Sequence, residues 1–88
     1  MDIEFDPDKA RKNLRKHQIN LADAEQALRD PLALTREDPD SRDEQRFVTL
    51  GMDISGKILV VVYTFRGVNI RLISARKASR AEMEMYYA

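Results

Sequence analysis

The feature that most constrains this fold is an uninterrupted run of six apolar residues, 58–63, in a chain of 88 residues. Successive side chains of a strand point to opposite faces of its sheet, so such a run requires cover on both faces. A chain of this length has room for one core. We therefore predict a single domain, residues 1–88, in which this run is a central strand and helices cover the sheet.

Turn residues and alternating apolar positions divide the rest of the chain into short elements. They predict five strands, over residues 3–5, 32–36, 46–53, 57–66 and 70–75. Helix starts are marked by Asp6-Pro7, by Asn20 with Asp23, and by the capping box of Ser79 with Glu82, so we predict helices over 7–17, 21–29 and 80–86. The order is β-α-α-β-β-β-β-α. We expect an α+β fold in which an antiparallel meander carries two N-terminal helices in front and one C-terminal helix behind.

Composition excludes several classes of protein. The chain has no cysteine, so it can form neither disulfides nor thiolate metal sites. One histidine and scattered carboxylates predict no metal site, and no nucleotide-binding motif predicts a cofactor. The longest apolar run is too short to cross a bilayer, and the acidic start is unlike a signal peptide. We expect a cytoplasmic protein without cofactors.

The net charge is zero, but the two halves of the chain differ in sign. Residues 1–45 carry 8 Lys/Arg against 12 Asp/Glu, whereas residues 46–88 carry 7 against 3. Arg66 and Arg71 flank one tight turn, so they are close in space, and Arg76 leaves the end of the same strand. Guanidinium groups held together bind a phosphate well. The alternative is that they pair with acids on a solvated face, as most surface charges do.

His17 is the candidate for proton transfer, because imidazole gains and loses a proton near neutral pH. Its place in the last turn of a helix has a second explanation, since a histidine there interacts favourably with the helix dipole. The basic helix 7–17 either tracks a nucleic-acid backbone or is a solvated face. We expect its packed stripe to hold Ala10, Asn13 and Leu14 together with His17.

A series of segments in fixed order carries a family resemblance. Near the start are Phe5-Asp6-Pro7-Asp8-Lys9-Ala10, Asn13, Lys16-His17, Ala24 and Asp30-Pro31. The middle contains Glu44-Gln45-Arg46-Phe47, Leu50-Gly51, Gly56-Lys57 and Val61-Val62-Tyr63-Thr64-Phe65-Arg66. The most specific segment is Ile70-Arg71-Leu72-Ile73-Ser74-Ala75-Arg76-Lys77-Ala78, followed by Glu82 and Tyr86. Together these segments resemble BrnT-type toxins over nearly the whole chain.

The resemblance implies a RelE-like fold and a toxin of a bacterial type II toxin–antitoxin system. Such a toxin is a ribonuclease that inhibits translation, and RNA supplies its own nucleophile, the 2′-hydroxyl, so no metal is required. It also implies a BrnA-type antitoxin whose DNA-binding part represses the operon, so DNA is contacted only through the antitoxin. A complex of two toxins and two antitoxins is expected on the same ground.

Site residues follow from combining the resemblance with the chemistry of RNA cleavage. We predict that Arg66, Arg71 and Arg76 bind the scissile phosphate and its transition state. Proton exchange is assigned to His17 or Lys16. Supporting or substrate-binding roles are predicted for Glu44, Arg46, Lys77 and Tyr86.

Two other classes of protein compete with this hypothesis. One is a non-catalytic binding module, a degenerate toxin or partner-docking protein whose arginines bind an acidic protein surface. The other is a DNA-binding regulator, which the zero net charge and the lack of a helix-turn-helix motif disfavour.

Overall fold

The apolar run 58–63 lies in β4, the middle strand of a five-stranded sheet. The computed structural model of the chain describes residues 2–88. The predicted element order and the α+β class are confirmed. The elements are β1 (Ile3–Glu4), α1 (Pro7–His17), α2 (Leu21–Leu28), β2 (Leu34–Glu37), β3 (Phe47–Met52), β4 (Ile58–Arg66), β5 (Asn69–Lys77) and α3 (Arg80–Tyr87).

The sheet is mixed, which corrects the prediction of a purely antiparallel meander. Its strand order is β1-β5-β4-β3-β2. Strands β2 to β5 pair antiparallel, but β1 runs parallel to β5, with Ile3 opposite Ile70. The reason is the connection: an antiparallel neighbour can follow through a hairpin, whereas β1 leads into α1 and α2 and reaches β5 only through the rest of the chain.

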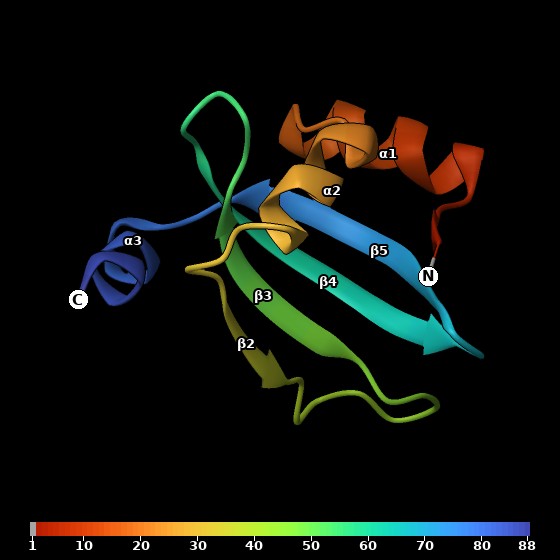
Figure 1. Ribbon diagram of the computed structural model, residues 1–88. Coiled ribbons are helices and arrows are strands. Elements are labelled where there is room, and N and C mark those ends of the chain that lie inside the picture. Colours follow the sequence, from red (N-terminus) through yellow and green to blue (C-terminus); the bar gives the residue numbers. More distant parts are fainter. Residues whose placement is uncertain (1) are drawn as a thin grey trace.

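Helices α1 and α2 lie across one face of the sheet (Figure 1). The core between them and the sheet contains the alternate residues Leu59, Val61 and Tyr63 of β4. From α2 it contains Leu21, Ala24 and Ala27, and from β5 Leu72 and Ala75. Contact between α2 and β3 is close, because a Cβ added to Gly51 would stand 2.1 Å from the Ala27 carbonyl oxygen. Only glycine fits there without a shift of the helix.

Helix α1 is attached to the sheet in a way that the predicted stripe misses. Leu14 is 49% exposed, so its assignment to the packed stripe is wrong. The buried residue of α1 is Asn13, at 6% exposure. Its side chain donates to the carbonyls of Ile19 and Ala75 and accepts from the Ala75 amide, at 2.9 to 3.0 Å. The hydrogen bonds of Asn13, and not the packing of Leu14, therefore hold α1 to β5.

Some element boundaries also differ from the prediction. β2 begins at Leu34 rather than 32, because the Asp30 side chain accepts from the Leu32 amide and holds residues 30–33 in a turn. β5 continues to Lys77, past a bulge opposite Val62 and Tyr63. None of the helices described in residues 2–88 combines the length and apolarity needed to cross a membrane.

Helix α3 covers only one end of the opposite face of the sheet. It stands beside the ends of β3 and β5 (Figure 1), where Met85 and Leu50 line one depression. Its N-terminus has the predicted capping box, in which Ser79 and Glu82 satisfy each other's backbone amides. The rest of this sheet face stays open, and that open face carries the candidate site.

Candidate active site

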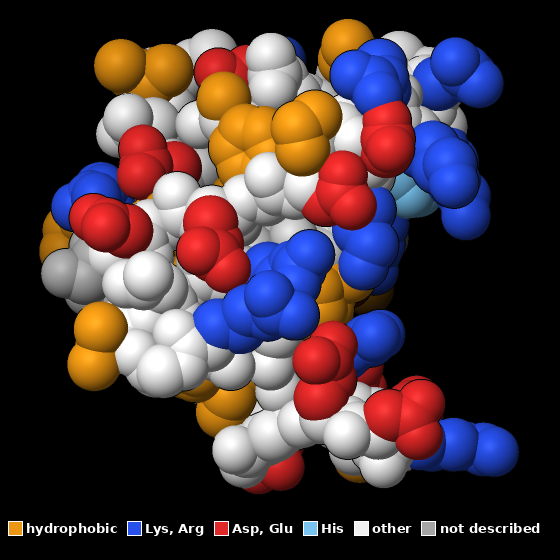
Figure 2. Space-filling model, turned by 90° about the vertical axis from the view of Figure 1, so that its right-hand side faces the viewer, with side chains coloured by type: hydrophobic (Ala, Val, Ile, Leu, Met, Phe, Trp, Pro, Cys, Tyr) orange, Lys and Arg blue, Asp and Glu red, His pale blue; other side chains and the backbone are white. Residues whose placement is uncertain are grey.

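The open face of the sheet is hollowed by a cavity of about 290 Å³. Figure 2 shows the hollow on its right-hand side, with the histidine and several basic side chains along its upper border. The floor is apolar and comes from β3 and β4. The polar lining comes from five segments: His17 of α1, Ser74 and Arg76 of β5, Arg36 of β2, Asp38 of the following loop and Glu82 of α3.

His17 is the last residue of α1 and reaches the cavity because the helix ends there. Gln18 takes a left-handed conformation, φ 57°, and its amide donates to the Leu14 carbonyl, which ends the helix. The His17 side chain is half-buried and lines both the cavity and a neighbouring depression. It is therefore placed at the edge of a space that a substrate can enter.

Arg76 is held in place by Glu82. Its two terminal nitrogens donate to the two carboxylate oxygens at 2.8 and 3.0 Å, and one also donates to the Lys77 carbonyl. Hydrogen bonding from Arg76 lowers the pKa of Glu82 to about 2, with help from the Ser79 amide. Glu82 is consequently a poor proton acceptor near neutral pH. Its role is to orient Arg76, which keeps further N–H groups for a ligand.

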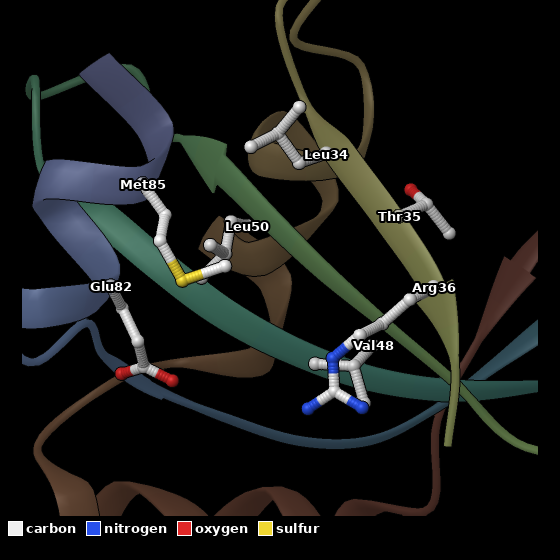
Figure 3. Close-up of a pocket in the computed structure, with 7 residues that line it drawn as sticks. All are labelled: Leu34, Thr35, Arg36, Val48, Leu50, Glu82 and Met85. Carbon is white, nitrogen blue, oxygen red and sulfur yellow. The ribbon is translucent and has the colours of Figure 1, made fainter. Parts of the chain in front are cut away.

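Arg36 is a cationic residue of the cavity that the predicted site did not include. It lies on β2 opposite Val48, and its side chain is exposed. In Figure 3 its guanidinium and the Glu82 carboxylate extend to the same side of the sheet. No carboxylate of residues 2–88 forms an ion pair with it. The only signal in the sequence was that Arg36 is two residues from Leu34 in a predicted strand, so both side chains share one face. The pairing of β2 with β3, which places Arg36 over the cavity, cannot be read from the sequence.

Arg66 and Arg71 lie together, as the turn between them predicts, but away from Arg76. They border a separate depression of about 280 Å³ with Glu4, Phe5 and Asp6. Arg71 and Arg76 are five residues apart on β5, roughly 15 Å at the rise of a strand. The three arginines therefore do not line one cavity, so the predicted convergence on a single point is not observed. Arg76 instead shares its cavity with Arg36.

The remaining predicted site residues lie around these depressions. Lys16 lines the depression beside His17 but not the cavity. Glu44 accepts from Arg46 at 3.4 Å, and it borders another shallow depression, over Phe47 and Phe65. Within residues 2–88 the buried Nε of Arg46 has no partner. Lys77 is exposed at the end of β5.

Tyr86 is engaged in a structural contact. Its hydroxyl donates a short hydrogen bond to the Asp30 carboxylate, which also accepts from the Met52 amide at 2.8 Å. The hydrogen bond between Tyr86 and Asp30 raises the pKa of Tyr86 to about 12 and lowers the pKa of Asp30. The tyrosine thus fastens α3 to the turn before β2, and it lines none of the cavities described above.

The ion pair of Arg76 and Glu82 predicts an acid-sensitive component of stability. Because the Glu82 pKa falls from 4.5 to about 2 on folding, this component is present above pH 4.5 and is lost as the pH falls toward 2. We expect a loss of about 1–2 kcal/mol over this range, since Arg76 is partly exposed. Glu82→Gln keeps the capping box and removes the titration. Urea unfolding at pH 3 and pH 6 should show a smaller pH difference in this variant, and an equal difference would contradict the assignment.

The geometry defines a small α+β domain with a histidine and two arginines around one open cavity. In residues 2–88, no group of three or more potential ligands is arranged to hold a metal ion. The sequence model of a family described as "Ribonuclease toxin, BrnT, of type II toxin-antitoxin system" matches residues 5–82. The class is therefore that of ribonuclease toxins, which implies an antitoxin partner. The chain belongs to the BrnT family, and the resemblance seen in its sequence is confirmed.

A solved structure supports this placement. The chain is similar to the Brucella abortus ribonuclease toxin BrnT, whose crystal structure has a resolution of 1.1 Å. The two are 28% identical with a TM-score of 0.68, and the match covers 91% of this chain and 99% of that chain. Among curated proteins, none matches this chain.

Proposed function

We propose that this chain is an endoribonuclease that works without a metal ion and that its active site is the cavity on the open sheet face. The observation that carries the proposal is the joint presence of His17, Arg36 and Arg76 around that one cavity. These are the two kinds of group that RNA cleavage needs: one that exchanges protons near neutral pH, and cations for the charged phosphorus.

The proposed reaction begins with the 2′-hydroxyl of the RNA, which His17 deprotonates. The 2′ oxygen bonds to the adjacent phosphorus, and Arg36 and Arg76 stabilise the negative charge that builds up on its oxygens. The bond from phosphorus to the 5′ oxygen then breaks, and that oxygen takes a proton from water in the open cavity. The hydroxide left by that water takes the proton from His17, which restores the neutral imidazole. The products are a 2′,3′-cyclic phosphate and a free 5′-hydroxyl.

The remaining predicted site residues take secondary places in this proposal. Arg66 and Arg71 face the RNA further along β4 and β5, where they bind phosphates away from the scissile one. Glu44, Arg46 and Lys77 are candidates for substrate contacts at the rim. Lys16 stays the alternative proton carrier, and Tyr86 acts through its attachment of α3.

We further propose the biological setting that the family membership favours. The toxin inhibits translation in the cytoplasm by cleaving RNA, and a BrnA-type antitoxin neutralises it in a complex of two toxins and two antitoxins. DNA is bound only by the antitoxin. We also infer a RelE-like fold, since two helices precede the antiparallel strands β2 to β5 and one follows them.

The proposal is tested with purified protein and single-stranded RNA in the presence of EDTA. We expect cleavage with 2′,3′-cyclic phosphate ends, and no cleavage of the same RNA with methylated 2′ oxygens. Expression in bacteria should arrest growth, and co-expression of the antitoxin should relieve the arrest. A requirement for divalent cations would overturn metal independence. Lack of both cleavage and growth arrest would leave the non-catalytic binding module as the function.

A further inference from the structure

A second depression adjoins the cavity and has a different electrostatic character. It is about 240 Å³ and lies between α1 and β5. It shares His17 and Ser74 with the cavity, so the two spaces meet at these residues. Lys9, Lys12 and Lys16 line it, and none of its lining residues is acidic. The cavity, in contrast, contains Asp38 and Glu82 beside its two arginines.

The three lysines form a row on one side of α1. They are three and four residues apart, which places them on the same side of a helix. At the rise of an α-helix the row is about 10 Å long, enough for a nucleic-acid strand to present more than one phosphate. Figure 2 shows basic side chains gathered beside the histidine at this border of the hollow.

These lysines are free to bind a ligand. All three are exposed, and none forms an ion pair with a carboxylate of residues 2–88. Arg11, on another side of the same helix, is paired with Asp8. The wall that carries the row is fixed, because Asn13 holds α1 to Ala75 of β5 through two hydrogen bonds. The row therefore keeps its position relative to His17.

We propose that the depression lined by Lys9, Lys12 and Lys16, here called the lysine groove, binds backbone phosphates of the RNA strand that flank the scissile phosphate. This inference rests on the proposed function, because the groove ends at His17. A row of flexible ammonium groups suits a repeating phosphate backbone. An acidic protein surface is less suited, since protein partners dock around buried apolar anchors and only Ile73 is apolar in this lining.

The test measures binding of a short single-stranded RNA whose 2′ oxygens are all methylated, so that it cannot be cleaved. The double variant Lys9→Gln with Lys12→Gln removes two phosphate contacts. We expect the slope of log Kd against log salt to fall by about 1.4, which is roughly a 25-fold weaker affinity near 0.1 M salt and little change near 1 M. With cleavable RNA, the effect should appear in KM. The matched control, Arg11→Gln with Arg15→Gln, makes the same charge change outside the groove and should keep the wild-type slope.

The outcomes separate this inference from the proposed function. If wild-type protein cleaves RNA but the lysine variant binds as the arginine variant does, the lysine groove is wrong and the nuclease proposal stands. If wild-type protein neither binds nor cleaves RNA, the proposed function fails and the groove fails with it. If the lysine variant keeps full RNA affinity but is no longer neutralised by the antitoxin, the groove belongs to the protein partner and the inference is overturned.

Discussion

Changing His17 to Ala is expected to lower kcat for RNA cleavage by about 10²- to 10⁴-fold, the usual contribution of a positioned general base. The fold should persist, because the imidazole is half-buried at the end of α1 and forms no hydrogen bond with residues 2–88. Single-turnover cleavage of a fluorescent RNA, measured beside the unfolding midpoint, gives both quantities.

Lys16→Gln is the informative comparison, because Lys16 is the other predicted proton carrier and neighbours His17 on the same helix. It lines the lysine groove but not the cavity, so its loss should act mainly on KM. Added imidazole should partly restore the rate of His17→Ala and should not restore that of Lys16→Gln. If Lys16→Gln loses kcat while His17→Ala keeps it, the proton carrier is Lys16 and the assignment made above is wrong.

Local rules of helix and strand formation are strong enough in this chain to predict most of the fold. The central strand follows from the run 58–63. The helix starts follow from Asp6, Asn20 and Ser79, whose side chains accept from backbone amides two or three residues later. The parallel partner of β5 could not be predicted this way. Residues 3–4 are far from Ile70 in sequence. Pairing over such a separation depends on how α1 and α2 pack on the sheet, which local sequence patterns do not specify.

The candidate site shows the same division. His17 and Arg76 could be selected from the sequence, since one is the only histidine and the other directly follows a predicted strand. Arg36 could not, because it reaches the cavity through the pairing of β2 with β3 across a loop of nine residues. The separation of Arg66 and Arg71 from Arg76 could not be predicted for the same reason. Their closeness to each other is local, whereas their distance from Arg76 depends on the length of β5, which was predicted two residues too short at its end.

Asn13 connects the fold to the candidate site, because its side-chain amide holds the helix that carries His17 against the edge of β5. β1 covers the outer edge of β5 only at Ile70 and Arg71, so the Ala75 amide and carbonyl further along that edge have no strand beside them. Asn13 donates to that carbonyl and accepts from that amide, which is the two-point pairing a strand residue would make. One helical turn later on α1 comes His17, so the anchor also sets where the imidazole stands.

Changing Asn13 to Ala is therefore expected to destabilise the protein by at least about 3 kcal/mol, since three buried backbone groups lose their partner at roughly 1–3 kcal/mol each. A domain of this size has about 5–15 kcal/mol in total, so the variant should approach unfolding at physiological temperature. Asn20→Ala is the matched control, because it removes the exposed cap bond to the Ala22 amide and should cost only about 1 kcal/mol. Urea unfolding of both variants measures the two losses in free energy of unfolding. Equal losses would mean that the Asn13 hydrogen bonds contribute no more than an exposed cap bond, and that packing alone holds α1 and His17 against β5.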